Sequence, residues 1–380
     1  MRFDRRELAG AVADLGVLVP IAVALIVKNG LSPTAVFLPA GLLYVAVALL
    51  YRLPVPVQPL KAFGAIAIAK GLGADDIAAG ALLMAVIFTV AGRLGLIDLA
   101  GRAFPRALVR GVQLTVGLLF LTIAWKLVAH PSKGFKDYAL DPRWAIPLAV
   151  AGVAVALLAR RWPVSLALVG VGVAVMLVQA GGDVALGPSA LHVPSWEAGT
   201  FWTALSLLVI PQVPLSFANS CLATSDAARV YFGRAAERVR PGRLATSFGT
   251  ANFLSAAISG MPVCHGAGGM TAHYAFGART GGAPLVLGSS LVVLAVGAGS
   301  GLAALLTAFP LPVLAALLAT AGLLHIGLLR DLRGWRNWAI ALVVGGLGFE
   351  LNLTIGLAAG LALWWIPVGA VRLRGALATG

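Results

Sequence analysis

The stretch GMPVCHGAGGMTAHYAFGARTGG, residues 260–282, interrupts a strongly apolar sequence with a proline, several glycines and polar side chains. A second interruption, RLPVPVQPLKAFGAIAIAKG at residues 52–71, occupies the corresponding place in the first half. Irregular backbone at membrane depth is tolerated only where protein or a water-filled cavity satisfies its polar groups. Paired breaks in the two halves of a membrane protein therefore point to a substrate site.

The composition is that of a polytopic membrane protein. Of 380 residues, 60% are hydrophobic and 11% are charged, and the mean hydropathy is +0.95. The first apolar run, residues 8–27, is too long for the core of a cleavable signal and contains Asp14. Cys221 and Cys264 both fall in predicted membrane segments, which argues against a disulfide framework.

The positions of the charges indicate a membrane orientation rather than nucleic-acid binding, although the formal net charge is +14. Arginines gather in alternate connections, which is the positive-inside pattern. Residues 181–199 contain no Lys or Arg and are expected outside, whereas the basic residues 126–143 do not fit this alternation. We therefore expect a protein of the cell (inner) membrane with both termini in the cytoplasm. The basic connections are residues 2–6, 93–110, 160–161, 229–243, 330–336 and 372–374.

Hydrophobic runs predict an all-α membrane fold with fourteen segments, two of which are the breaks. The two halves also resemble each other, since Ala-Phe-Pro at residues 103–105 recurs at residues 308–310. Seven segments per half is an odd number, so the repeats must be inverted, with the breaks as segments 3 and 10. The other predicted spans are residues 8–27, 35–50, 77–92, 108–128, 144–159, 164–179, 201–224, 244–259, 285–306, 313–329, 338–349 and 351–371.

The breaks predict two short half-helices that meet near the middle of the membrane. Pro54, Pro56 and Pro59 disfavour a continuous helix and favour an extended segment before residues 60–69. The glycines at positions 266, 268 and 269 allow close backbone approach in the second break. A helix N-terminus carries roughly half a positive charge and free N–H donors. Two such termini that face each other would form an anion site.

Side chains at the first break also indicate a negatively charged substrate. Lys61 lies in the first turn of the predicted half-helix, where an unpaired ammonium is costly, and Gln58 is a neutral donor beside it. A snorkelling or structurally paired lysine is the alternative to a substrate-binding one. The second break has no acidic residue, which argues against cations and nucleobases as substrates. Neither its histidines nor their spacing suggests a metal site, and His265 is expected to hold the break through backbone contacts.

Several stretches resemble the molybdate transporter family related to the sulfate permeases. These are PVPVQPLKA (residues 54–62), IPQVPLSFANSCLAT (residues 210–224), PVCHGAGGMTAHYAFGART (residues 262–280) and the opening AGAVADLGVLVP (residues 9–20). The resemblance covers nearly the whole membrane region, and PVCHGAGG is its most specific motif. It implies oxyanion uptake and the uracil-permease-like fold of seven plus seven inverted segments.

The resemblance also implies two domains. Residues 1–95 and 199–308 would form a core that binds the substrate, and residues 96–198 and 309–380 would form a gate. Because the sequence given ends at Gly380, no cytoplasmic regulatory domain is expected.

The candidate site combines both breaks with the first helix of each half. Asn219 corresponds to Asp14 between the halves; it is either a donor to the oxyanion or an interhelical amide contact. Asp14 would repel a dianion, so it should be protonated, paired with Lys61 or turned away, and it is the candidate proton-coupling group. The candidate substrate-binding residues are Gln58, Pro59, Leu60, Lys61, Asn219, Ser220, Ala267, Gly268 and Gly269.

Three function classes follow from these features. The first is a secondary active transporter for a tetrahedral oxyanion, with molybdate as first choice and sulfate or tungstate as alternatives. The second is an uncoupled oxyanion channel, and the third, a membrane enzyme, lacks a catalytic constellation. No cofactor, metal or nucleic acid is expected. The sequence contains no P-loop motif, so direct use of ATP is not expected either. The expected partners are the oxyanion, the bilayer and protons as coupling ion, with a homodimer as an alternative to the monomer.

Overall fold

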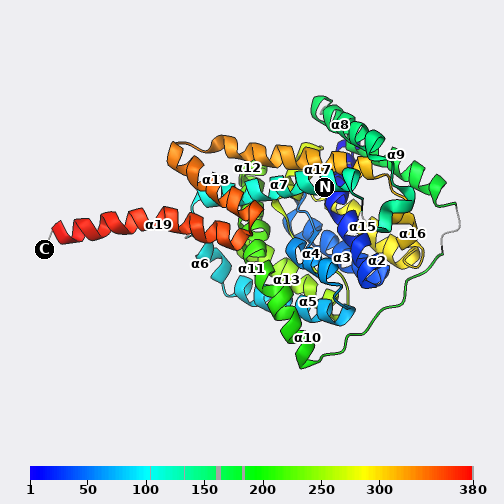
Figure 1. Ribbon diagram of the computed structural model, residues 1–380, viewed down its shortest axis with the longest axis horizontal. Coiled ribbons are helices and arrows are strands. Elements are labelled where there is room, and N and C mark those ends of the chain that lie inside the picture. Colours follow the sequence, from blue (N-terminus) through cyan, green and yellow to red (C-terminus); the bar gives the residue numbers. More distant parts are fainter. Residues whose placement is uncertain (103, 132, 160–163, 182–184, 379–380) are drawn as a thin grey trace.

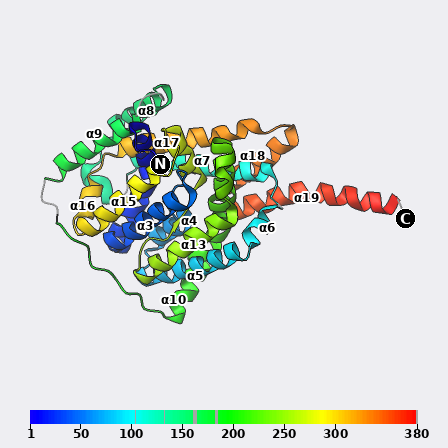
Figure 2. The same cartoon turned by 180° about the vertical axis from the view of Figure 1, so that it is seen from behind.

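The computed structural model describes residues 1–102, 104–131, 133–159, 164–181 and 185–378, so the expected outer connection at residues 181–199 lies partly outside the described residues. Helices cross the molecule in several directions, and the last helix projects away from the rest with the C-terminus (Figure 1). The view from behind shows the same projecting helix on the opposite side (Figure 2).

The first break divides the helices of the N-terminal part. A broken first span is followed by one continuous span, the break and another span. The elements are α1 (Arg5–Ala11), η1 (Val12–Asp14), α2 (Leu15–Asn29), α3 (Pro33–Tyr51), β1 (Gln58–Pro59), α4 (Lys61–Lys70) and α5 (Ala74–Arg93).

The next part consists of helices without a break of this kind. Its elements are α6 (Leu96–Arg102), α7 (Arg106–Ala129), η2 (Lys133–Tyr138), α8 (Pro142–Leu158) and α9 (Val164–Gln179).

The second half begins with a long helical run that contains two π-helical stretches, η3 and η4. Its elements up to the second break are α10 (Ala198–Thr203), η3 (Ala204–Val209), α11 (Ile210–Leu215), η4 (Ser216–Ala223), α12 (Thr224–Phe232), η5 (Gly233–Arg238), α13 (Pro241–Ala257) and β2 (Val263–Cys264). The elements after β2 are α14 (Ala267–Ala275), α15 (Gly282–Gly297), α16 (Leu302–Thr307), α17 (Leu311–Ile326), η6 (Gly327–Asp331), α18 (Trp335–Glu350) and α19 (Leu353–Ala378).

Local sequence signals account for several helix ends. Asp4 caps α1, and the amides of Glu7 and Arg6, which donate to it, hold the pKa of its carboxyl below the usual value. Ser32 caps α3, which starts with a proline. Gly30 ends α2 with a φ of 71°, a left-handed conformation that favours glycine.

Six continuous helical stretches of the described chain are long and apolar enough to cross a membrane. The prediction of one span at residues 285–306 was wrong, because the chain leaves the helix between α15 and α16. The six stretches are Arg5–Asn29, Pro33–Tyr51, Ala74–Arg93, Arg106–Ala129, Ala198–Arg238 and Leu311–Asp331.

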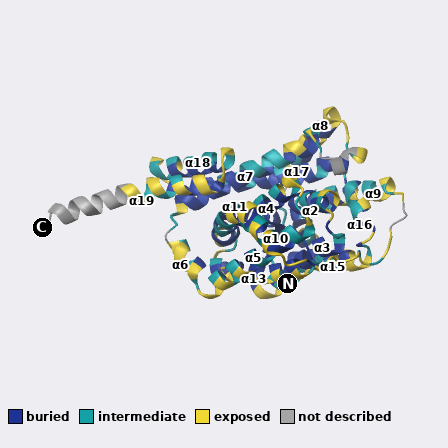
Figure 3. Ribbon diagram, turned by 60° about the horizontal axis from the view of Figure 1, so that its bottom comes forward, coloured by how far each residue is buried: buried dark blue, intermediate teal, exposed yellow. Residues whose placement is uncertain are grey.

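Buried apolar side chains form three clusters in the described residues. The largest joins α2, α3 and α5 with α13 and the two breaks. The second packs α2 against α7, α8 and α17, and the third packs α7 against α18 and the C-terminal part of η4. Figure 3 shows exposed positions on the outer elements, such as α6 and α8, and buried positions where the helices converge. The two breaks therefore lie inside the packed part of the protein.

Candidate functional site

The two breaks pair with each other as short antiparallel strands. Gln58 lies opposite Cys264 and Pro59 lies opposite Val263. The pairing continues one residue further, where the Leu60 amide donates to a carbonyl of the second break at 3.1 Å. The two breaks therefore meet, as predicted, and their extended segments run antiparallel.

Each strand leads directly into a short helix. Helix α4 begins at Lys61 and helix α14 begins at Ala267. The residues before them, Leu60 and Gly266, have extended backbone and contribute no side-chain cap. The first amides of a helix have no partner inside the helix. Both half-helices therefore start beside the strand pair and bring N–H donors to it.

A chain of hydrogen bonds joins three of the predicted site residues. Lys61 Nζ donates to Gln58 Oε1 at 2.7 Å, and Gln58 Nε2 donates to Asp14 Oδ1. The hydroxyl of Tyr44 donates to the other carboxylate oxygen of Asp14 at 2.8 Å. Asp14 is thus neither turned away nor in direct contact with Lys61, because Gln58 stands between them.

The hydrogen-bonded series of Lys61, Gln58 and Asp14 places one ammonium and one carboxylate in the interior of the protein. Lys61 is 8% exposed and Asp14 is 1% exposed. The ammonium of Lys61 also lies 5.7 Å from the ring centroid of Phe120 on α7. Taking a charge out of water is costly unless it is paired and hydrogen-bonded. Because Gln58 donates to the carboxylate and accepts from the ammonium, it links the two charges without direct contact.

Glycines let the first turn of α14 lie close to the hydrogen-bonded side chains of Gln58 and Asp14. A Cβ atom on Gly269 would lie 2.5 Å from Gln58 Nε2 and 2.8 Å from Asp14 Oδ1. A Cβ atom on Gly268 would collide with the ring of Phe120. Real Cβ atoms do not approach other atoms this closely without a shift. The predicted residues Gly268 and Gly269 therefore lie against Gln58, Asp14 and the α7 wall.

Asn219 and Ser220 lie on η4, and both are almost fully buried. The Asn219 side-chain oxygen has no hydrogen-bond partner among the described residues. No hydrogen bond of the described chain connects either side chain to Gln58 or Lys61. The structure therefore brings Asp14, Gln58, Lys61 and the α14 glycines together, while Asn219 and Ser220 stay outside this hydrogen-bond chain.

Two amide side chains, Gln212 and Asn252, hold the backbone of the breaks. Gln212 Oε1 accepts the amide of Phe63, in the first turn of α4, at 2.9 Å. Asn252 binds both backbone groups of Val263: its Nδ2 donates to the carbonyl at 2.8 Å, and its Oδ1 accepts the amide at 2.7 Å. Asn252 thus forms the two hydrogen bonds with Val263 that a neighbouring strand would form. The only indication of these roles in the sequence was that Gln212 and Asn252 are amides within apolar spans.

His265 also holds the second break in place, as predicted. Its Nδ1 lies 2.8 Å from the carbonyl oxygen of Pro56, and its Nε2 lies 2.8 Å from Ser247 Oγ on α13. These contacts connect the two breaks to α13. The ring is fully buried and both of its nitrogens have partners within the protein, which agrees with the expected structural role.

Comparison with known families matches residues 6–120 and 204–324 to a family described as "Molybdate transporter of MFS superfamily". Molybdate transporter 1 of Arabidopsis thaliana is 28% identical over 96% of this chain and 90% of its own length. Molybdate transporter 2 of the same plant is 27% identical over 94% and 86%. Molybdate transporter 1 of Chlamydomonas reinhardtii is 29% identical over 93% and 91%.

Comparison with solved structures identifies the fold. The transmembrane domain of the cyanobacterial bicarbonate transporter BicA superposes with a TM-score of 0.58 at 17% identity, and the match covers 95% of this chain and 98% of that domain. SLC26A9 gives a TM-score of 0.60 at 17% identity, with coverage of 96% and 65%. The helical arrangement is therefore similar to that of BicA and SLC26A9. At this identity the likeness concerns the fold alone.

Proposed function

The chain belongs to the molybdate transporter family, and we propose that it is a secondary active transporter that takes up molybdate by alternating access. One observation carries the proposal: the β1–β2 pair places the starts of α4 and α14 beside Lys61. Two helix N-termini and one ammonium suit a tetrahedral dianion, which needs several donors and compensating positive charge.

In the proposed site the oxyanion accepts hydrogen bonds from Lys61 and from backbone amides at Ala267, Gly268 and Gly269. Pro59 and Leu60 shape the first strand and the start of α4 next to it, and Gln58 donates a neutral hydrogen bond. Asn219 and Ser220 close the site from η4. The contacts between Gln58, Lys61 and the first turn of α14 support this arrangement.

Asp14 is the proposed coupling group. Its carboxylate already takes donors from Gln58 and Tyr44, so a dianion that binds at Lys61 must share Gln58 with it. Two neighbouring negative sites repel each other in a medium of low dielectric. A proton on Asp14 would remove that repulsion and free Gln58 to donate to the substrate. Proton uptake and anion binding would then be coupled.

The proposed architecture has fourteen segments in two inverted repeats, with α4 and α14 as segments 3 and 10. Residues 1–95 and 199–308 form the core that carries the site, and residues 96–198 and 309–380 form the gate. Both termini face the cytoplasm of a cell whose inner membrane holds the protein. Alternating access then requires a rigid displacement of the core against the gate.

Uptake of radiolabelled molybdate into proteoliposomes tests this function. The expected result is saturable uptake that an inward proton gradient accelerates and that Lys61→Ala strongly reduces. Lys70→Ala, at the exposed end of the same helix, is the matched control and should behave as wild type. An absence of molybdate uptake by folded wild-type protein would overturn the proposal.

Competition distinguishes the alternatives. Excess sulfate or tungstate that displaces molybdate at equal concentration would make the site a general oxyanion site. Currents far above carrier turnover would identify an uncoupled channel. Pocket size and donor geometry set the choice among these anions.

A further inference from the structure

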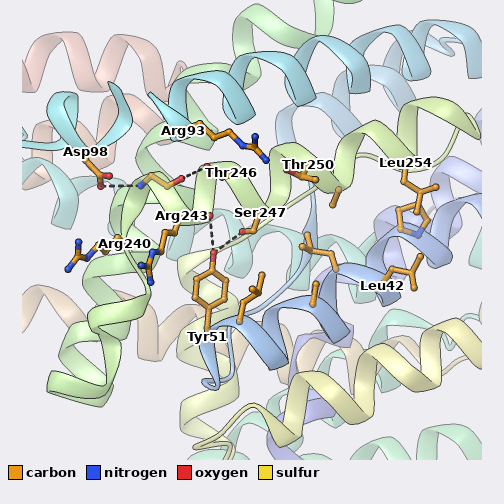
Figure 4. Close-up of a pocket in the computed structure, with 17 residues that line it drawn as sticks. Leu42, Tyr51, Arg93, Asp98, Arg240, Arg243, Thr246, Ser247, Thr250 and Leu254 are labelled. Carbon is orange, nitrogen blue, oxygen red and sulfur yellow. Dashed lines mark hydrogen bonds between the residues drawn. The ribbon is translucent and has the colours of Figure 1, made fainter. Parts of the chain in front are cut away.

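A groove of about 720 Å³ lies on the outside of the two breaks, between α3, α5 and α13 (Figure 4). It is separate from the chain of Asp14, Gln58 and Lys61, none of which lines it. Residues of α13 form its floor, with Ser247, Thr250 and Leu254 on one stripe of the helix. The groove is therefore distinct from the candidate anion site.

One part of the groove is apolar, and two of its leucines are exposed. Leu42 and Leu50 of α3 line it and are 42% and 59% exposed, and Leu254 of α13 lines it as well. The stripe from Arg243 to Leu254 extends roughly 16 Å along α13 at 1.5 Å per residue. That length matches one leaflet, since the hydrocarbon core of a bilayer is about 30 Å thick.

The other part of the groove is basic. Arg93 ends α5, while Arg240 and Arg243 lie at the start of α13, and all three are exposed. Their guanidinium groups form no ion pair within the described residues. Asp98 is the acidic residue among those that line the groove; it accepts the Gly242 amide at 3.1 Å, and one carboxylate cannot neutralise three guanidinium groups. This end of the groove therefore favours an anion.

We propose that the groove binds an anionic phospholipid. Its phosphate would lie at Arg243 and Arg93, which can each donate two hydrogen bonds to phosphate oxygens, and one acyl chain would lie along α13. The arginine distribution places the basic end at the cytoplasmic surface, where the headgroups of anionic lipids attract basic residues. Free phosphate would leave the apolar part empty, and a neutral lipid would leave the arginines without a partner.

A series of hydrogen bonds would connect the bound lipid to the two breaks. Tyr51 donates to the carbonyl of Arg243 at 2.9 Å and lies 2.9 Å from Ser247 Oγ. Ser247 contacts His265, which contacts Pro56 of the first break. Three side chains and two backbone carbonyls thus connect the headgroup end to the strands. A lipid that stabilises this end of α13 also stabilises the position of the breaks.

Direct lipid binding tests the proposal without any transport assay. Purified full-length protein in nonionic detergent is titrated with phosphatidylglycerol, and bound lipid is counted by native mass spectrometry. The double variant Arg93→Gln/Arg243→Gln should bind phosphatidylglycerol at least tenfold more weakly. The control Arg234→Gln/Arg238→Gln removes the same charge from η5, outside the groove, and should bind as wild type. Thr250→Trp keeps every arginine, fills the apolar part and should also lose binding.

The same titration separates the other occupants. Equal loss in both arginine pairs would mean nonspecific charge attraction and would overturn the proposal. So would equal binding of phosphatidylcholine, or displacement of phosphatidylglycerol by millimolar inorganic phosphate. Light scattering that shows a dimer which Thr250→Trp dissociates would assign the groove to a second copy of the chain instead. If the arginine variant fails to fold, unchanged lipid binding in folded Thr250→Trp would by itself overturn the proposal.

Discussion

Arg110 on α7 forms an ion pair with Asp226 on α12, 116 residues further along the chain. The same guanidinium donates to Asp331 Oδ1 at 2.9 Å and to Gln113 Oε1 at 2.7 Å. The Arg110 side chain is fully buried, while the two aspartates are 23% and 33% exposed. Asp226 belongs to the proposed core, whereas Arg110 and Asp331 belong to the proposed gate. One buried cation therefore ties the two proposed domains together.

The first prediction concerns this cation. Arg110→Gln should lower the free energy of unfolding by about 2 kcal/mol, because it leaves charged hydrogen-bond partners unpaired. Arg110→Lys should not restore the loss, since an ammonium cannot reproduce the forked geometry. Arg106, whose side chain is 60% exposed, pairs with the same Asp331. Arg106→Gln is the control and should change stability by at most about 0.5 kcal/mol. Equal losses in a denaturant titration of both variants would contradict the assignment.

The second prediction concerns the ammonium in the candidate site. Lys61→Ala should weaken molybdate binding at least tenfold, about 1.4 kcal/mol, because two helix termini supply only about one compensating charge. Gln58→Ala should lose less, since it removes a neutral hydrogen bond that water can replace. Equilibrium binding to purified, monodisperse variants measures both. Wild-type affinity in Lys61→Ala would make the lysine structural and leave the backbone dipoles as the site.

The third prediction concerns proton coupling. The groups that face Asp14 are the Tyr44 hydroxyl and the Gln58 amide, with Lys61 one hydrogen bond further. Asp14→Asn mimics the protonated carboxyl, so molybdate binding should persist while the acceleration by an inward proton gradient disappears. Proteoliposome uptake at matched and unmatched pH measures this difference. If wild type and Asp14→Asn respond alike to the gradient, coupling does not pass through this carboxyl.

The fourth prediction tests the close approach of α14. In Gly269→Ala the added methyl group would lie 2.6 Å from Pro56 Cβ and 2.5 Å from Gln58 Nε2, so the strand or the helix must shift. Molybdate binding should fall at least tenfold. In the control Gly346→Ala, on α18, the methyl group would meet nothing within 4 Å. That variant should bind normally and be no less stable, because alanine favours helix over glycine. Normal binding by Gly269→Ala would place the substrate away from this turn.

The sequence was sufficient to predict the breaks because prolines and glycines act locally. Pro54, Pro56 and Pro59 exclude a continuous helix wherever they occur, so the extended segment before α4 needs no tertiary information. The end of α15 carried a comparable signal, Gly-Ala-Gly-Ser-Gly at residues 297–301, which the hydropathy of the span obscured. Length and apolarity alone joined two helices that the glycines separate.

The contacts that hold the breaks could not be predicted in this way. Gln212 and Phe63 are 149 residues apart, and their bond depends on how η3 and α11 pack against α4. An amide in an apolar helix indicates that it has some partner, but not which one. The link from Lys61 through Gln58 to Asp14 has the same origin. Each residue was identified separately, and only the packed structure shows the order of the three along one chain.

The pairing of β1 with β2 has a consequence for biosynthesis. His265 and the Pro56 carbonyl that it contacts are separated by 209 positions, so most of the polypeptide must be made before they can meet. Until then the strand of the first break has no partner, and hydrocarbon alone would leave its backbone groups unsatisfied. Before α14 is made, the polar groups at the start of α4 must be satisfied by water, lipid headgroups or the insertion machinery. The proposed anion site can therefore form only after the second break has been made.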